Sequence, residues 1–241
     1  MTKKKSSFRE NFKALFVALI AALILRAFVI QAFRIPTGSM KDTLLIGDFL
    51  LVNKFVYGAK TPERIIGTDM TIPSVRLPAF QEPEHGDIVI FKYPENPRLD
   101  YIKRCVGLPG DTLEVKDNLV YINGEPEGEQ EFIKKRFDPE SGFYVNYYQI
   151  TKPDGREYTI RKFDERSSRY ANFGPVVVPD DHLFMMGDNR DNSADSRYWG
   201  YMPEDNVVGQ PLVIYFSWDK HKPFFNLPAA IRWERIFSVI K

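Results

Sequence analysis

The longest apolar stretch of the chain lies near its N-terminus. Residues 14–25 contain no polar side chain, and after Arg26 the apolar pattern resumes and ends at Phe33. A bilayer core requires about 20 such residues, and an arginine near one end of a spanning helix can extend its charged head to the interface. The pattern therefore predicts a transmembrane helix over residues 12–33.

The residues that flank this stretch favour a retained anchor over a cleaved signal peptide or a buried core helix. Cleavage after Ala27 or Ala32 would place Leu25 or Ile30 where a signal peptide needs a small residue. The basic residues before the span are Lys3, Lys4, Lys5, Arg9 and Lys13. The positive-inside rule then predicts that residues 1–11 form a cytoplasmic tail and that residues 34–241 are extracytoplasmic.

Beyond Phe33 the apolar runs are short and rich in β-branched and aromatic residues. Residues 87–93 and 210–216 are typical of strands, and residues 113–115 and 119–122 flank a short turn as in a hairpin. The chain has 17 prolines and 15 glycines, which suit turns and edge strands better than long helices. We therefore expect a mainly β protein, with one all-β domain after the anchor.

Two later segments depart from this pattern. Residues 125–168 are charged and rich in tyrosine, and we interpret the region of about 125–173 as an inserted β-ribbon lobe. In the last stretch, residues 230–241, the apolar residues Trp233, Ile236, Phe237 and Ile240 recur at helical intervals. This spacing predicts a packed terminal helix.

Composition excludes some functions and leaves others open. The 33 basic residues nearly balance the 32 acidic ones, whereas a nucleic-acid-binding domain is usually strongly basic. No nucleic-acid partner is therefore expected. Cys105 is the single cysteine, so an intramolecular disulfide is excluded.

The first candidate for chemistry is Ser39, which follows the end of the apolar stretch by six residues. An extended chain covers at most about 3.6 Å per residue, so this hydroxyl lies within about 20 Å of the bilayer boundary. A serine nucleophile needs a base, yet His85, His182 and His221 all occur in turn-like, charged or strand-edge contexts. The serine also lacks the G-x-S-x-G elbow of α/β-hydrolases. A different base is required.

Lys103 is the candidate for that base. It lies in a strand-like apolar run that a Pro-Gly turn ends, and burial there would lower the pKa of its amine from about 10.4. Strand alternation places it on one face with Tyr101 and Cys105, while Arg104 points to the other. By pattern alone, a solvated lysine remains the commoner interpretation.

Four segments, taken together, resemble the bacterial type I signal peptidases, or leader peptidases. They are the Ser39-Met40 pair, residues 47–54, residues 101–111, and the GDNRDNSADSRYWG run at 187–200, in the family's order behind an anchor. The resemblance covers roughly residues 10–124 and 174–218. It implies a β fold like that of these peptidases and the LexA-like proteins, with a serine–lysine dyad and no cofactor.

The same resemblance implies a role for each matching residue. Ser39 is the nucleophile, Lys103 is the general base, and the oxyanion hole consists of the Ser39 N–H and the hydroxyl of Thr37, where better-known members have serine. Ser193 orients the lysine, and Asp188, Arg190, Asp195 and Arg197 support its loop. The walls of the substrate pocket are Ile35, Pro36, Met40, Tyr101 and Ile102.

The implied substrates are preproteins with N-terminal signal peptides, cut after small-x-small (Ala-x-Ala) motifs at the outer face of the bacterial inner membrane. Membrane lipid is a further expected partner, with the Sec or Tat export machinery nearby. Arg34 and the apolar surface around residues 72–80 either rest on the lipid interface or belong to a loop packed on the protein, and the sequence fits both interpretations equally. A metal site is not expected, because a calcium loop beginning at Asp188 would need an oxygen ligand in place of Arg190 and a glycine in place of Ser193.

Two other functions remain open from the residues. A self-cleaving serine–lysine repressor would share the dyad, but it would need a DNA-binding helix pair at the N-terminus, where this chain has its apolar stretch. A membrane-tethered β-rich binding or scaffold protein would use Ser39 as an ordinary turn residue. Loss of cleavage on replacing Ser39 or Lys103 separates the enzyme from the scaffold.

Overall fold

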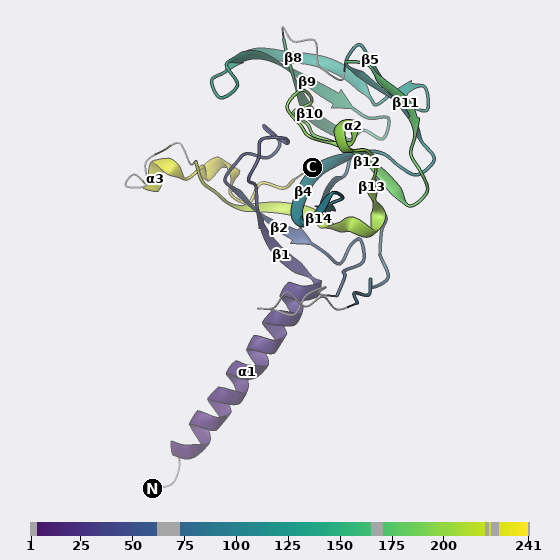
Figure 1. Cartoon of the computed structure of the whole chain (residues 1–241). Coiled ribbons are helices and arrows are strands. Elements are labelled where there is room, and N and C mark those ends of the chain that lie inside the picture. Colours follow the sequence, from purple (N-terminus) through teal and green to yellow (C-terminus); the bar gives the residue numbers. More distant parts are fainter. Residues whose placement is uncertain (1–3, 62–72, 165–170, 220–221, 223–226, 241) are drawn as a thin grey trace.

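The computed structural model describes residues 4–61, 73–164, 171–219, 222 and 227–240. One long helix, α1 (Lys4–Phe28), projects from a body made of β-sheets (Figure 1). The largest sheet has seven antiparallel strands in the order β1-β2-β14-β3-β4-β12-β13. Their bounds are β1 Ile30–Arg34, β2 Asp48–Asn53, β3 Ile88–Tyr93, β4 Asn96–Gly107, β12 His182–Met186, β13 Met202–Pro203 and β14 Val207–Ser217. The expectation of a mainly β protein is confirmed.

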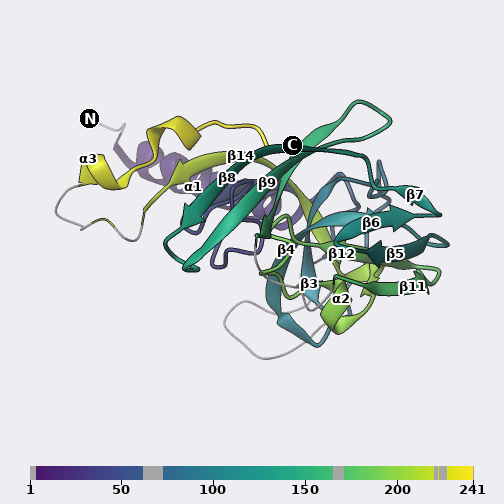
Figure 2. The ribbon, with the colours of Figure 1, turned by 90° about the horizontal axis from the view of Figure 1, so that it is seen from above.

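Two smaller antiparallel sheets complete the body. One has the order β11-β5-β6-β7, and the other has the order β10-β9-β8. Their bounds are β5 Thr112–Lys116, β6 Leu119–Ile122, β7 Glu125–Pro126, β8 Glu129–Asp138, β9 Phe143–Thr151, β10 Glu157–Phe163 and β11 Phe173–Val177. The predicted hairpin at 113–122 is therefore confirmed, as β5 and β6. In the view from above, the four-stranded sheet lies at the right of the molecule (Figure 2).

The short helices lie in the connections. They are α2 Ser196–Trp199, α3 Leu227–Ala230 and the 3₁₀ turns Glu204–Asn206 and Trp233–Arg235. The strand patterns predicted at 87–93 and 210–216 are confirmed as β3 and β14.

Apolar side chains from several strands form the core. One buried cluster joins Ile35, Met40 and Leu44 of the β1–β2 connection to Ile102 of β4 and Ile214 of β14. A second cluster includes Val89, Phe91 and Cys105, with Tyr101 packed against it. Because strand side chains alternate between faces, β4 contributes to both clusters. Residues 102–107 of β4 are all buried, so this strand lies at the centre of the body.

The helix predicted over residues 12–33 has different bounds in the structure. It begins at Lys4 and ends at Phe28, and residues 30–34 form β1, which pairs with β2 in continuous register. The backbone of this segment is therefore satisfied by a neighbouring strand. No helix within the described residues combines the length and hydropathy expected of a membrane-crossing segment, so the predicted transmembrane helix is not confirmed.

The terminal helix predicted over residues 230–241 is wrong. Residues 233–235 form a single 3₁₀ turn, Phe237 has a φ of 64°, and Val239 forms a β-bridge with Val213. The N–H groups of Phe237 and Ile240 donate to carbonyls of β14 at 2.7 and 3.0 Å. The carbonyls of β14 therefore accept N–H groups that would have bonded within a helix. Trp233 and Phe237 are largely exposed rather than packed.

Residues 129–163 form the sheet β10-β9-β8, inside the region interpreted as an inserted lobe. This sheet lies on the side of the body away from the free end of α1 (Figure 1). Of the residues expected to contact lipid, Val75 and Phe80 are strongly exposed, while Ile72 falls outside the described residues.

Candidate active site

Ser39 lies in the connection between β1 and β2, in a turn that the core holds on both sides. Ile35 and Met40 are buried in the first core cluster, and the N–H of Leu44 donates to the carbonyl of Met40 at 2.6 Å. The Asp48 carboxylate accepts the N–H of Leu45 at 2.8 Å and so closes the end of the connection. Ser39 itself is only 7% exposed. Its position is fixed by packing rather than left to a free loop.

Lys103 brings its amine to this serine from β4. Its Nζ lies 2.7 Å from Ser39 Oγ and 3.0 Å from the carbonyl oxygen of Ile102, and the residue is 3% exposed. Burial lowers the pKa of Lys103 to about 8, although the negative charges of Asp195 and Asp188 oppose that shift. The structure therefore joins the predicted nucleophile and the predicted base directly.

The neighbouring Arg104 takes part in a buried ion pair behind the site. Its Nε and Nη2 donate to the two carboxylate oxygens of Asp188 at 2.8 and 2.7 Å, and both side chains are 1% exposed. Asp188 also accepts the Thr43 hydroxyl at 2.6 Å. This bidentate pair links β4 to the loop after β12 and to the loop that carries Ser39. Sequence reasoning placed Arg104 on the opposite face but missed its pairing with Asp188.

The other supporting residues form two further buried pairs. Asp195 caps α2 by accepting the N–H of Arg197, and its carboxylate pairs with the Arg197 guanidinium at 2.9 and 2.8 Å. Arg190 donates through both terminal nitrogens to Glu127 at 2.8 Å each. Glu127, which sequence reasoning also missed, lies some sixty residues upstream, where no local pattern indicates a partner.

Backbone contacts join the loop after β12 to the serine loop. The N–H of Asn189 donates to the carbonyl of Ser39 at 3.0 Å, and its side-chain amide donates to the carbonyl of Gly38 at 2.9 Å. Gly187 approaches so closely that an added Cβ would lie 2.5 Å from the Ser39 carbonyl and 2.3 Å from Ser193 Oγ. Only glycine fits at this position. The predicted site residues of the two loops are thus in contact.

Ser193 lacks the contact that its expected role requires, and no contact within the protein bears on the expected role of Thr37. Ser193 Oγ is buried and has no hydrogen-bond partner among the described residues, so a bond to Lys103 is not present in this conformation. Thr37 is exposed and precedes Ser39 by two residues. Both residues lie in the two loops that form the site, but their functional roles remain predictions.

The residues predicted to line the substrate pocket divide into two groups. Ile35, Met40 and Ile102 are buried together in the core beneath the dyad, whereas Pro36 is exposed. The Tyr101 ring stacks on Tyr93 with centroids 4.4 Å apart, and the amine of Lys103 lies 5.1 Å from its centroid. The apolar surroundings of the dyad are therefore present, and most of them are packed core.

Comparison with known proteins identifies relatives of the whole chain. The family model described as "Signal peptidase, peptidase S26" matches residues 8–218. A signal peptidase I of Pseudomonas aeruginosa is 40% identical, over 91% of this chain and 76% of that protein. A signal peptidase I of Aquifex aeolicus is 35% identical, over 87% of this chain and 84% of that protein. A signal peptidase I of Rickettsia typhi is 33% identical, over 98% of this chain and 96% of that protein.

A crystal structure of a signal peptidase I from Enterococcus faecalis V583 is also similar, at 27% identity and a TM-score of 0.33, over 54% of this chain and 97% of that one. The family match covers most of the chain, and it favours a peptidase over a binding or scaffold protein. The chain therefore belongs to the signal peptidase family, peptidase S26, and is a serine peptidase.

Proposed function

We propose that this signal peptidase family member cuts exported preproteins after small-x-small motifs, with Ser39 as nucleophile and Lys103 as general base. The observation that carries the proposal is the 2.7 Å contact between Ser39 Oγ and a buried lysine amine. Burial disfavours the ammonium form, so the pKa of Lys103 falls to about 8 and a useful fraction of the amine is neutral near neutral pH. A neutral amine can take the serine proton.

The reaction then follows from the two groups. Lys103 removes the hydroxyl proton while Ser39 Oγ attacks the scissile carbonyl, and the ammonium next gives that proton to the leaving amine. The same amine activates the water that hydrolyses the acyl-enzyme. The Ser39 N–H and the Thr37 hydroxyl stabilise the oxyanion, and Ser193 orients the amine during these steps. The exposure of Thr37 is compatible with a bond that forms only to substrate.

The proposed substrate preference rests on the apolar, buried neighbours of the dyad. Met40 and Ile102, which adjoin Ser39 and Lys103 in sequence, are buried, and apolar walls of this kind would favour a small substrate side chain over a bulky one. Alanine at the residue before the cut satisfies this restriction. Pro36 and Tyr101 are the less buried members of the proposed pocket wall.

The direct test is cleavage of a purified preprotein with an Ala-x-Ala site in detergent micelles. We expect the intact chain to cut after the second alanine and the variants Ser39→Ala and Lys103→Ala to cut nothing, with circular dichroism unchanged. Thr37→Val should lose roughly 2.7 to 4 kcal/mol of transition-state stabilisation if its hydroxyl serves the oxyanion. Ser193→Ala should be slowed but active. Cleavage that survives loss of Ser39 or Lys103 would exclude the dyad.

We further propose that α1 attaches the peptidase to the bacterial inner membrane as a single-pass anchor, with the β-sheet body on the outer side. Support comes from the apolar side chains that α1 exposes, among them Phe12, Leu15, Phe16, Val17, Leu19, Leu23 and Leu25. A contiguous exposed apolar surface of this kind marks a membrane or protein contact. The basic residues ahead of it predict a cytoplasmic N-terminus.

Flotation with phosphatidylethanolamine–phosphatidylglycerol vesicles tests this attachment. The intact chain should float with the vesicles, and Leu15→Glu combined with Leu19→Glu should not. The matched control replaces two exposed apolar residues of the body, Leu119→Glu with Val177→Glu, and should float like the intact chain. Flotation of the α1 variant would contradict the proposal.

A further inference from the structure

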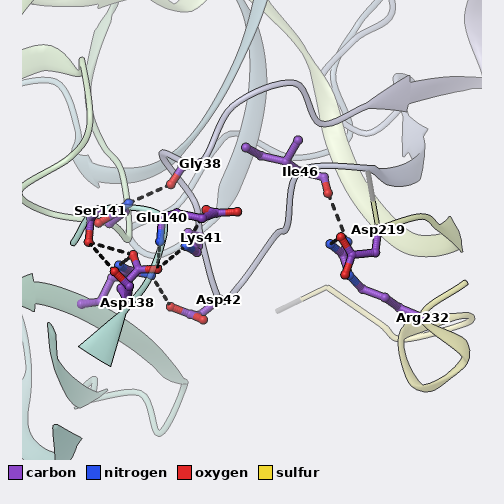
Figure 3. Close-up of polar contacts among 11 residues, drawn as sticks. Gly38, Lys41, Asp42, Ile46, Asp138, Glu140, Ser141, Asp219 and Arg232 are labelled. Atoms are coloured by element: carbon purple, nitrogen blue, oxygen red, sulfur yellow. Dashed lines mark hydrogen bonds and ion pairs between the residues drawn. The ribbon is translucent and has the colours of Figure 1, made fainter. Parts of the chain in front are cut away.

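The sheet β10-β9-β8 forms ion pairs with the loop that carries Ser39. Lys41, two residues after the serine, contacts Asp138 at 2.8 Å and Glu140 at 2.6 Å (Figure 3). Asp138 is the last residue of β8, and Glu140 lies in the turn between β8 and β9. A residue next to the candidate nucleophile is thus tied to a hairpin almost a hundred residues away in sequence.

Asp42 makes a second tie to the same sheet. Arg161 of β10 donates through Nη1 to Asp42 at 3.1 Å and through Nη2 to Asp138. Asp138 therefore links the two cations, Lys41 and Arg161. Burial alone would raise the pKa of Asp138, but its bonds to these cations lower that pKa to about 2. Asp138 therefore stays charged at any pH at which the enzyme would be assayed.

The backbone of Asp42 shows that the network holds a strained conformation. Its φ is 81°, in the left-handed region that side chains other than glycine rarely adopt. Such a residue persists only where its surroundings determine its position, and such residues cluster at functional sites. Here the surroundings include the ion pair to Arg161, whose side chain is 2% exposed.

Arg161 also contacts the second loop of the site, through its backbone. Its N–H donates to the carbonyl of Asp188 at 2.9 Å, and its carbonyl accepts the N–H of Arg190 at 3.0 Å. The segment between these two bonds contains Asn189, which bonds Ser39 and Gly38. One residue of the inserted sheet therefore holds both loops that meet at the dyad.

We propose that the sheet β8–β10 is a positioning device for the active site: the clasp of Lys41, Asp42, Asp138, Glu140 and Arg161 fixes the loop of Ser39 against Lys103. The inference rests on the proposed function, since it takes Ser39 as the nucleophile. The clasp residues act through Ser39 and are positioning residues. None of them is assigned a contact with substrate.

The expected effect is on turnover rather than on substrate binding. Misplacing a reacting group by about 1 Å can reduce the rate about 100-fold. Loosening the clasp should therefore lower kcat, while KM changes little because the substrate-contacting residues stay in place. A clasp that merely stabilised the fold would lower the melting temperature and leave kcat intact well below that temperature.

Two variants remove one charge each with little change of shape. Lys41→Met keeps the apolar stem of the lysine without its amine, and Asp42→Asn keeps a residue that tolerates the left-handed region. We expect kcat to fall roughly 10- to 100-fold in each, with KM changed less than about threefold. Lys41→Arg keeps the positive charge and can still reach the carboxylates of Asp138 and Glu140, so this variant should retain most of the wild-type kcat.

The matched control is Lys135→Met. Lys135 lies on the same strand, β8, and pairs with Asp164, which is not a residue of the clasp. It should keep the wild-type kcat. Wild-type kcat in Lys41→Met and Asp42→Asn would overturn the inference, as would an equal loss in the control or a loss expressed mainly in KM. Ser39→Ala, assayed in parallel, distinguishes the proposed function from the positioning role. If Ser39→Ala is inactive while the clasp variants are fully active, the proposed function stands and the positioning role is excluded.

Discussion

Replacing Lys103 with arginine is expected to reduce preprotein cleavage by about 100- to 10,000-fold, the contribution of a general base. Arginine keeps the positive charge but stays protonated at every working pH, so it cannot accept the proton of Ser39. The 2.7 Å contact between the lysine amine and Ser39 Oγ makes the proton transfer direct. Single-turnover cleavage of the Ala-x-Ala preprotein measures this loss.

The pH profile of the unmodified enzyme carries the same information. Because burial lowers the pKa of Lys103 to about 8, kcat/KM should rise with pH through about 8 and level off above it. The same pKa shift affects stability, because the folded state binds the Lys103 proton less tightly than the unfolded chain does. Below pH 8 this difference lowers the free energy of unfolding by about 3 kcal/mol, and the loss disappears as pH rises toward 10.5. Lys103→Met should therefore be inactive yet at least as stable at pH 7.

Lys162→Arg provides the matched control for the arginine variant. Lys162 is a second buried lysine whose pKa burial lowers to about 8, but its amine contacts Asn118 and Gln130 instead of Ser39. This variant should retain activity. Strong cleavage by a folded Lys103→Arg enzyme, or a profile that rises only near the ordinary lysine pKa of about 10.4, would exclude Lys103 as the base.

The sequence predicted the elements whose signals are local. Alternating apolar residues identified β3 and β14, and the short turn identified the β5–β6 hairpin. The candidate dyad required only two residue types and the family resemblance, and the structure places the two side chains in contact. Where a local pattern competed with a tertiary partner, the prediction was wrong. Residues 230–241 have helical spacing, yet β14 offers their backbone a partner.

The ion pairs behind the site could not be predicted for a different reason. Arg104 and Asp188 are 84 residues apart, and Arg190 and Glu127 are 63 apart, so no periodicity relates them. The same holds for the ion pairs that join Lys41 and Asp42 to the sheet β10-β9-β8. Each of these charges alone resembles a solvated surface residue. Only the fold shows that they are matched, and that the Arg104–Asp188 and Arg190–Glu127 pairs are also buried.

Replacing Glu127 with alanine is expected to lower the free energy of unfolding by about 3 to 5 kcal/mol, the cost of leaving a buried charge without its partner. Glu127 accepts two bonds from Arg190 and one from the Tyr158 hydroxyl, and the Tyr158 ring lies 3.9 Å from the Arg104 guanidinium carbon. Burial opposes ionisation of Glu127, yet Arg190 lowers its pKa, so the carboxylate is charged in the fold. Urea unfolding at pH 7 measures the change.

The size of this effect separates a buried pair from an exposed one within the same protein. Glu114 pairs with Lys116 at 2.7 Å, but the lysine side chain is 61% exposed, so water screens this pair and its contribution to stability is small. Glu114→Ala is therefore the matched control. Glu127→Gln, which keeps an acceptor for Tyr158 but loses the charge, should fall between the two. An equal free energy of unfolding for Glu127→Ala and Glu114→Ala would mean that water or another group solvates Arg190 in the variant. The buried pair would then not stabilise the loop that carries Ser193.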